Sequence, residues 1–465
     1  MNEHVQVPWM TESLCPTCLE RISAERVIDG NDVWLIKVCP EHGQTRTILW
    51  RGTPDLTGWQ RPKVPSQPPV CYTETLRGCP YDCGLCSNHG QHTCSALLEI
   101  TQRCNLRCPI CFADSGKEAE TDPGLEVIDE WLNSVRHACG EKIVIQLSGG
   151  EPTVREDLPD IIRLARSHGF GFIQINTNGL RLAEDPAFVR QLAAAGLTSV
   201  FLQFDGTHDG IYRQLRGREM FADKVRAIEQ CVESKLGVVL VPTLVPGINN
   251  QDIGAIIRFG MEHAPGVRGV HFQPVSYFGR YPGSPGNEQR LTLPDIIRAI
   301  DQQTDGLLQV ENFAPPGCEH SHCSFHGNFL LLEDGSVRAL SSKGSCCSKP
   351  APASEGAAKS KEFLIRQWAA PDVEMQDQKT DKKTCCNPPK VPSLDDFLQR
   401  VKTHTFAVSA MAFQDVWNVD LERTRNCCIH VVARDGRLVP FCLFNLTSAS
   451  GETLHRGNNH ANHSA

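Results

Sequence analysis

Cysteine is the residue that most constrains what this chain can fold into, because it occurs 22 times among 465 residues. Many of these cysteines stand in tight groups with two or three residues between them. Thiolates at such spacings suit a shared metal better than a mutual disulfide. The N-terminus has neither the basic start nor the apolar core of a signal peptide, which argues against secretion. We therefore predict a metal-binding protein of a reducing compartment, the cytoplasm.

Composition narrows the class of protein further. The net charge of −8 gives no general attraction to nucleic acid or to an anionic membrane. No apolar run reaches the length of about 18 residues that a membrane span needs, so we expect no transmembrane segment. Hydrophobic residues make up 40% of the chain, which is ordinary for a globular protein.

Composition also divides the chain into segments. A proline-rich linker, Arg61 to Pro69, separates a short Cys/His-containing segment from a cysteine-dense one. We expect a rubredoxin-like or zinc-ribbon-like knuckle domain over 1–60 and a linker with an auxiliary-cluster segment over 61–94. An α/β domain is expected over 95–305, followed by a cysteine-rich domain over 306–454. We expect a flexible insertion at 341–392 within that domain and a disordered tail over 455–465.

Strands and helices are expected to alternate between residues 95 and 305. Apolar runs typical of buried strands begin at 95, 142, 171, 199, 237 and 269, and amphipathic stretches occupy 155–168, 185–195, 222–235 and 250–263. This alternation predicts βαβ units and a parallel sheet. Six units are too few for a closed eight-stranded barrel. We therefore predict a partial (β/α)6 barrel with functional residues at the carboxyl ends of its strands.

The loop after the first predicted strand carries Cys104, Cys108 and Cys111 in the pattern CxxxCxxC. A cubane [4Fe–4S] cluster normally takes four cysteines. Three thiolates leave one iron open to a small chelating ligand, so the triplet predicts a cluster with a free coordination position. The alternative is a structural zinc or cluster site on an ordinary α/β domain.

This motif resembles the signature of the radical S-adenosylmethionine (SAM) superfamily. The second predicted strand ends in SGGEP, residues 148–152, which is similar to the GGE motif of that family. The resemblance covers about 95–305. It implies that SAM chelates the open iron and is cleaved reductively to a 5′-deoxyadenosyl radical, which attacks an unactivated C–H bond. It also implies that Cys104, Cys108 and Cys111 are catalytic, and that the ends of three strands bind the cofactor through Gly149, Gly150, Glu151, Asn176, Asn178, Gln203 and Asp205.

The CxxxCxxC spacing also occurs earlier, at Cys79, Cys83 and Cys86, and Cys94 follows close by. With four candidate ligands, this set predicts a fully ligated auxiliary [4Fe–4S] cluster. Zinc is the alternative, because spacing alone does not separate the two.

Two metal-binding knuckles stand about twenty residues apart near the N-terminus. They predict a mononuclear tetrahedral site with three sulfur ligands and one nitrogen, holding either iron or zinc. Its ligands are Cys15, Cys18, Cys39 and His42.

The C-terminal region contains a further candidate ligand set. Adjacent cysteines cannot easily ligate one cubane without strain, so one of Cys427 and Cys428 is expected to join Cys318, Cys323 and Cys442 in a second auxiliary [4Fe–4S] cluster. The other then serves a further cluster or remains a buried thiol. Four cysteines in the predicted insertion receive no assignment: Cys346, Cys347, Cys385 and Cys386.

The order of all these motifs resembles the tetraether synthase group, which also contains archaeal proteins assigned to methylation of a pterin precursor. The resemblance rests on GCPYDCGLC, CNLRCPICFA and NCCIH, in that order. It implies either coupling of unactivated lipid carbons, our leading interpretation, or cobalamin-independent methylation of a pterin or similar heterocycle. A non-catalytic iron–sulfur electron carrier is a third interpretation.

The two reactions predict different pockets but the same kind of electron donor. A lipid enzyme should have a long apolar tunnel, whereas a pterin enzyme should have a compact pocket with aromatic and hydrogen-bonding groups. Either needs an electron donor such as ferredoxin or flavodoxin. The expected partners are therefore a small-molecule or lipid substrate and that donor, with no nucleic acid; peripheral contact with a membrane stays open.

Overall fold

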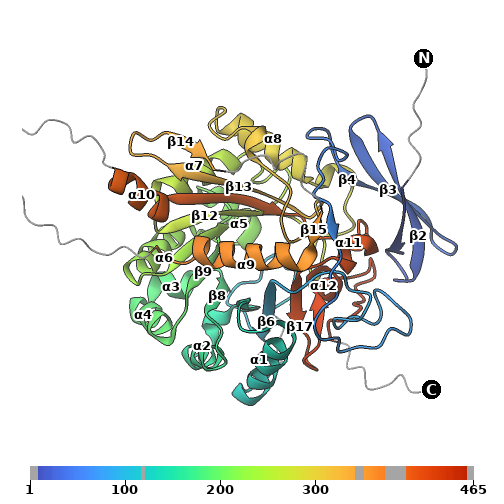
Figure 1. Cartoon of the computed structure of the whole chain (residues 1–465), viewed down its shortest axis with the longest axis horizontal. Helices are drawn as coiled ribbons and strands as arrows, with labels where there is room; N and C mark the ends of the chain where they lie inside the picture. Colours follow the sequence, from blue (N-terminus) through green and yellow to red (C-terminus); the bar gives the residue numbers. More distant parts are fainter. Residues whose placement is uncertain (1–8, 117–120, 341–349, 372–393, 458–465) are drawn as a thin grey trace, which may run out of the picture.

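One large sheet organises the computed structural model, which describes residues 9–116, 121–340, 350–371 and 394–457 (Figure 1). Its strand order is β14–β13–β16–β12–β10–β9–β8–β7–β6–β17–β18, with β11 paired to β12. Six central strands are parallel and follow one another along the chain, as predicted. They are β6 (Ser95–Thr101), β7 (Val144–Gly149), β8 (Phe172–Thr177), β9 (Ser199–Gln203), β10 (Gly237–Val241) and β12 (Val267–Pro274); the short β11 is Thr243–Leu244.

Helices cover the outer face of this sheet, and the strands alternate accordingly. In β7, Ile145 and Leu147 belong to the large apolar core beneath the helices, whereas Gln146 and Ser148 face the other side. The covering helices are α1 (Leu125–Cys139), α2 (Leu158–Ser167), α3 (Leu180–Glu184), α4 (Pro186–Ala195), α5 (Asp209–Arg216), α6 (Phe221–Glu233), α7 (Ile253–Glu262) and α8 (Leu293–Gln303). The partial α/β barrel is thereby confirmed.

The C-terminal region extends the barrel at both edges. Strand β16 (Thr405–Met411) pairs in parallel with β12, and β17 (Ile429–Val432) pairs in parallel with β6, so eight neighbouring strands run in the same direction. The segment expected to form a separate cysteine-rich domain therefore shares the sheet. The same region also contains β13 (Ser324–Leu331), β14 (Val337–Ala339), β18 (Leu438–Pro440), α10 (Leu394–Thr403), α11 (Leu421–Arg425) and α12 (Phe441–Asn445). Short 3-10 helices lie elsewhere along the chain, at Pro152–Val154, Asn287–Gln289 and Val310–Asn312.

A separate antiparallel sheet forms the N-terminal domain, in the order β1–β2–β3–β4. Buried polar contacts fasten it to the C-terminal region: Lys37 Nζ donates to the Val416 carbonyl at 2.7 Å, and Arg26 pairs with Asp420 at 2.7 Å. Its strands are β1 (Trp9–Leu14), β2 (Arg21–Asp29), β3 (Asp32–Cys39) and β4 (Gly43–Trp50), and β5 (Lys63–Val64) in the linker pairs with β15 (Ala351–Pro352).

Helix α9 (Ala353–Trp368) corrects the expectation of a flexible insertion. It lies across the inner face of the sheet (Figure 1), and Trp368 packs in an apolar cluster with Val144 and Phe201. The insertion looked mobile because its composition is polar, but the apolar positions of α9 are placed to cover the sheet. Cys346, Cys347, Cys385 and Cys386 lie outside the described residues. None of the described helices combines the length and apolar character that crossing a membrane requires.

The close approach of α9 to the sheet predicts a stability effect at Gly237. A Cβ at Gly237 would lie 2.2 Å from the Trp368 carbonyl oxygen, whereas one at Gly171 would meet nothing within 4 Å. Gly237→Ala should therefore lower the free energy of unfolding by about 1–3 kcal/mol through overpacking. Gly171→Ala is the control and should change it little. Anaerobic urea unfolding measures both, and equal midpoints for the two variants would contradict this placement of α9.

Candidate functional site

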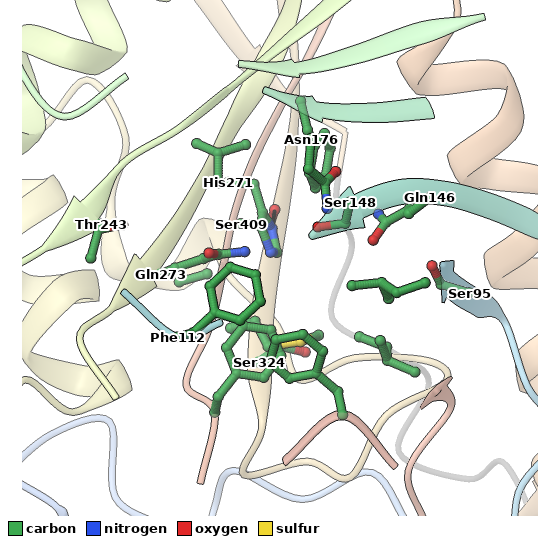
Figure 2. A pocket seen from close by; sticks show the side chains of 18 of the residues that line it. Ser95, Phe112, Gln146, Ser148, Asn176, Thr243, His271, Gln273, Ser324 and Ser409 are labelled. Atoms are coloured by element: carbon green, nitrogen blue, oxygen red, sulfur yellow. Dashed lines mark hydrogen bonds between the residues drawn. The ribbon is translucent and has the colours of Figure 1, made fainter. Parts of the chain in front are cut away.

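A cavity of about 510 Å³ opens on the inner face of the sheet, between the barrel strands, the cysteine loop and α9 (Figure 2). The ends of β7, β8 and β9 converge on it, as the carboxyl ends of parallel strands do. Nine of the ten residues expected to bind the cluster or SAM line it: Cys104, Cys108, Cys111, Gly149, Gly150, Glu151, Asn176, Asn178 and Gln203.

Backbone hydrogen bonds join the start of the cysteine loop to the end of β7. Gly150 N donates to the Thr101 carbonyl at 2.8 Å, and Glu151 N donates to the Arg103 carbonyl at 2.9 Å. A Cβ at either glycine would lie 2.1 Å from one of these carbonyl oxygens, and Gly149 has a φ of +124°. The paired glycines are therefore required for the cysteine loop to lie against the sheet.

The Glu151 side chain is fully buried and organises the strand ends. Its carboxylate accepts hydrogen bonds from the Thr153 and Thr177 hydroxyls, each at 2.7 Å, and from the Asn178 backbone N–H at 2.7 Å. Both oxygens of this carboxylate are therefore already engaged within the protein.

The two asparagines at the end of β8 have different surroundings. Asn178 Nδ2 donates to Asn105 Oδ1 at 2.7 Å, which ties the cysteine loop to this strand as well. Asn176 Oδ1 is buried, has no partner among the described residues, and belongs to a residue that lines the cavity. An unpaired acceptor of this kind is costly unless a ligand satisfies it.

Asp205 does not occupy the expected position. It is fully buried behind the cavity wall, and its carboxylate forms a two-point ion pair with Arg216, at 2.7 Å to Nε and 2.8 Å to Nη2. Burial alone would lower the pKa of Arg216, but the Asp205 carboxylate raises it, so the guanidinium stays charged. Arg216 lines the cavity and is the charged group that Asp205 positions there. The sequence shows an arginine eleven residues after Asp205, but no local pattern assigns it to the site.

Arg280 is a second residue that the sequence does not reveal. It follows β12, and its side chain donates to the Cys108 carbonyl at 2.9 Å. Its backbone also exchanges hydrogen bonds with Cys111 at 2.9 and 3.0 Å. Arg280 therefore holds the Cys108–Cys111 side of the cysteine loop in place.

Burial raises the pKa of the Cys104 thiol to about 12, so its thiolate needs a metal to persist at neutral pH.

The remaining cysteines group differently from the expectation. The sulfur atoms of Cys94, Cys318 and Cys428 lie within 4.8 Å of one another, which corrects the assignment of Cys94 to the Cys79–Cys86 triplet. The cause is long-range: β6 begins beside β17, and Cys94 N donates to the Cys428 carbonyl at 2.7 Å. Cys94 and Cys428 line the cavity.

The two adjacent cysteines have different surroundings. Cys428 lies with Cys94 and Cys318, whereas burial raises the pKa of the Cys427 thiol to about 12, with a contribution from the charge of Cys323. Cys318 therefore groups with Cys94 and Cys428 and not with Cys323 and Cys442, as had been expected. Cys79 and Cys83 contact each other through their side chains, and Cys86 lies near Cys83.

The N-terminal knuckles come together as predicted. The ligand atoms of Cys15, Cys18, Cys39 and His42 all lie within 4.8 Å of one another. His42 Nδ1 is 3.6 Å from Cys15 Sγ and 3.5 Å from Cys39 Sγ. Three sulfurs and one nitrogen at these separations fit a single tetrahedral ion.

Comparison with known proteins agrees with this geometry. Residues 98–260 match the model of the radical SAM superfamily, and residues 7–51 match the HMPTM N-terminal zinc ribbon domain. The 7,8-dihydro-6-hydroxymethylpterin dimethyltransferase of Methanocaldococcus jannaschii is 35% identical over 96% of this chain and 94% of its own length. The chain belongs to the radical SAM superfamily. It is therefore an enzyme, and its superfamily implies a [4Fe–4S] cluster and SAM as cofactors.

Other known proteins match a smaller part of this radical SAM enzyme. A GTP 3',8-cyclase of Paenarthrobacter nicotinovorans is 31% identical over 41% of this chain and 54% of its own length. The crystal structure of Streptococcus suis SuiB bound to the precursor peptide SuiA matches 47% of each chain, with a TM-score of 0.40 and 16% identity.

The contact between Gly150 and the cysteine loop predicts a selective loss of iron. A methyl group in Gly150→Ala would displace the Arg103 carbonyl and with it the adjacent Cys104. The variant should lose the iron of one cubane, about four atoms per chain, and retain the N-terminal metal. Gly171→Ala serves as the control. Metal analysis of anaerobically reconstituted protein gives the answer, and full iron content in Gly150→Ala would contradict the role given to this contact.

The N-terminal site predicts an independent metal. Cys39→Ser removes one of four ligands and should release about one metal ion per chain, leaving the iron at Cys104, Cys108 and Cys111 in place. Glu41→Ala, at an exposed position between Cys39 and His42, is the matched control. Elemental analysis of both variants also identifies the ion as iron or zinc. Unchanged metal content in Cys39→Ser would mean that the cluster of ligands holds none.

Proposed function

We propose that this radical SAM enzyme is a methyltransferase that acts on a pterin or a similar flat heterocycle. The observation that carries the proposal is a pair of buried oxygens on the cavity wall, Asn176 Oδ1 and Ser95 Oγ, which have no hydrogen-bond partner among the described residues. A substrate edge rich in donors and acceptors would satisfy such atoms.

A lipid substrate suits this cavity less well than a heterocycle. Covering either oxygen with an alkyl chain would leave it unpaired in an apolar setting, at a cost of about 1–3 kcal/mol. Polar side chains face the cavity from several strands (Figure 2), including Gln146, His271 and Gln273. Aromatic side chains such as Phe112 and Phe201 complete the lining. Apolar side chains make up most of the lining and a few polar groups stand among them, as in pockets for small molecules. The similarity to the pterin dimethyltransferase supports a heterocycle over lipid coupling.

The residues around the cavity fit the two implied cofactors. Cys104, Cys108 and Cys111 would hold a [4Fe–4S] cluster by three thiolates, with the fourth iron open to the amino and carboxylate groups of SAM. When bound, the cluster supplies the electron that cleaves SAM reductively. The backbone edge at Gly149–Glu151 would bind the SAM amino group, and Asn178, Gln203 and the amide nitrogen of Asn176 would contact its ribose or carboxylate. Arg216 adds a positive charge suited to that carboxylate.

The other cysteine groups are proposed as auxiliary centres. Cys94 and Cys428 line the cavity, and together with Cys318 they would hold iron next to the substrate. The group Cys323, Cys427 and Cys442 and the triplet Cys79, Cys83 and Cys86 are candidates for further iron–sulfur ligation. Such centres would pass electrons from a ferredoxin-like or flavodoxin-like donor.

A product analysis tests the proposed function. Anaerobic enzyme with dithionite, 6-hydroxymethyl-7,8-dihydropterin and SAM carrying a deuterated methyl group should yield 5′-deoxyadenosine and a labelled methylated pterin, detected by mass spectrometry. Cys104→Ala, Cys108→Ala and Cys111→Ala should each abolish both products and leave most other iron bound. Cleavage of SAM without methyl transfer to any pterin, together with coupled lipid products from the same enzyme, would contradict the proposal.

A further inference from the structure

Three aromatic rings from three different elements lie together on the wall of the cavity. Phe201 of β9 stacks against His271 of β12 at 5.8 Å between ring centroids, with an interplanar angle of 27°. Trp368, at the end of α9, lies 4.8 Å from Phe201 and 6.3 Å from His271. All three residues line the cavity, so they form a continuous aromatic surface below the strand ends where SAM is proposed to bind.

His271 is held by a partner on the neighbouring strand. It lies directly opposite Ser409 in the β12–β16 ladder, and His271 Nδ1 is 2.9 Å from Ser409 Oγ. That ring is 8% exposed, and burial lowers the pKa of His271 to about 4, which keeps the imidazole neutral. Among the described residues Nε2 has no hydrogen-bond partner, so it is the ring nitrogen left for a ligand.

The His271–Ser409 pair can present either hydrogen-bonding sense. When the serine hydroxyl donates to Nδ1, Nε2 carries the proton and is a donor. When Nδ1 donates to the hydroxyl, Nε2 becomes an acceptor. No other described residue forms a hydrogen bond with the Ser409 hydroxyl, so no such bond selects one tautomer, and a substrate edge would select it.

The opposite wall supplies fixed polar groups. Gln146 Nε2 donates to Gln174 Oε1 at 2.8 Å, and Gln174 Nε2 donates to Ser199 Oγ at 3.1 Å. This chain of amides crosses β7, β8 and β9 and orients the Gln146 carboxamide, whose oxygen has no partner among the described residues. Asn176 Oδ1 lies on the same wall without a partner. Figure 2 shows the side chains of Gln146, Asn176, His271 and Ser409 around one space.

We propose that His271, positioned by Ser409, is the substrate-binding residue that reads the hydrogen-bonding edge of a neutral, flat heteroaromatic ring packed against Phe201 and Trp368. The inference rests on the proposed function and deepens it, because it names the residues that select the ring and hold it below SAM. It also gives α9 a role: Trp368 completes the substrate subsite from a segment outside the barrel.

Two substitutions at His271 separate its ring nitrogens. His271→Asn keeps an amide near Ser409 but removes the atom facing the cavity, whereas His271→Gln places an amide at the Nε2 position. His271→Asn should raise the dissociation constant for 6-hydroxymethyl-7,8-dihydropterin about tenfold or more, the loss of roughly one hydrogen bond. His271→Gln should recover most of that affinity. Ser409→Ala frees the ring and should weaken binding by a smaller factor, about threefold.

Anaerobic titration calorimetry of the reconstituted enzyme with this pterin, and separately with SAM, measures these affinities. The expected pattern is weaker pterin binding with unchanged SAM affinity and iron content, and less methylated product per 5′-deoxyadenosine in His271→Asn. Equal pterin affinity in wild type and His271→Asn would overturn the inference, as would a parallel loss of SAM affinity or iron, which would indicate a scaffolding role. Failure of the wild type to bind any pterin would instead overturn the proposed function.

Discussion

Two backbone hydrogen bonds join the cysteine loop to the glycine edge of β7, and the rest of the site depends on them. They link the carbonyls of Thr101 and Arg103 to the N–H groups of Gly150 and Glu151. Side chains at Gly149 and Gly150 would collide with those carbonyls, so the contact forms only because both residues lack a side chain. The same edge carries the Glu151 carboxylate that holds the end of β8. A cluster bound by the loop is thereby placed against the strand ends where SAM is proposed to bind.

The C-terminal part of the chain completes the cavity around that contact. Strands β16 and β17 extend the sheet at its two edges, and each brings functional side chains with it. Ser409 arrives on β16 beside His271, and Cys428 arrives next to β17 beside Cys94. Helix α9 covers the inner face between them. The substrate space is therefore made by parts of the chain more than two hundred residues apart, and neither the barrel alone nor the extension alone would enclose it.

Local patterns were sufficient to predict the barrel, because each buried strand and each amphipathic helix is indicated by the hydrophobic pattern of its own consecutive residues. The run 95–101 coincides with β6, and the loop motif and SGGEP were both placed correctly at the cavity. Pairing between distant strands was not predictable in this way. Cys94 was therefore grouped with the nearest cysteines, although β17 brings Cys428 to it. Asp205 was placed at the site by its strand-end position, but it is fully buried in an ion pair, and its partner Arg216 is the residue that lines the cavity. The flexible insertion predicted from polar composition was wrong at α9, because composition does not show that Trp368 and other apolar residues of this segment pack on the sheet.

The proposed chemistry requires a cluster at Cys104, Cys108 and Cys111 with one iron that the protein leaves free for SAM. Electron–nuclear double resonance on the reduced enzyme with SAM labelled at the amino nitrogen and carboxylate oxygen tests this directly. We predict hyperfine coupling from both labels to the cluster, lost when SAM is omitted. Coupling from neither label, or a signal from a protein side chain as the fourth ligand, would contradict the assignment of this loop as the catalytic centre.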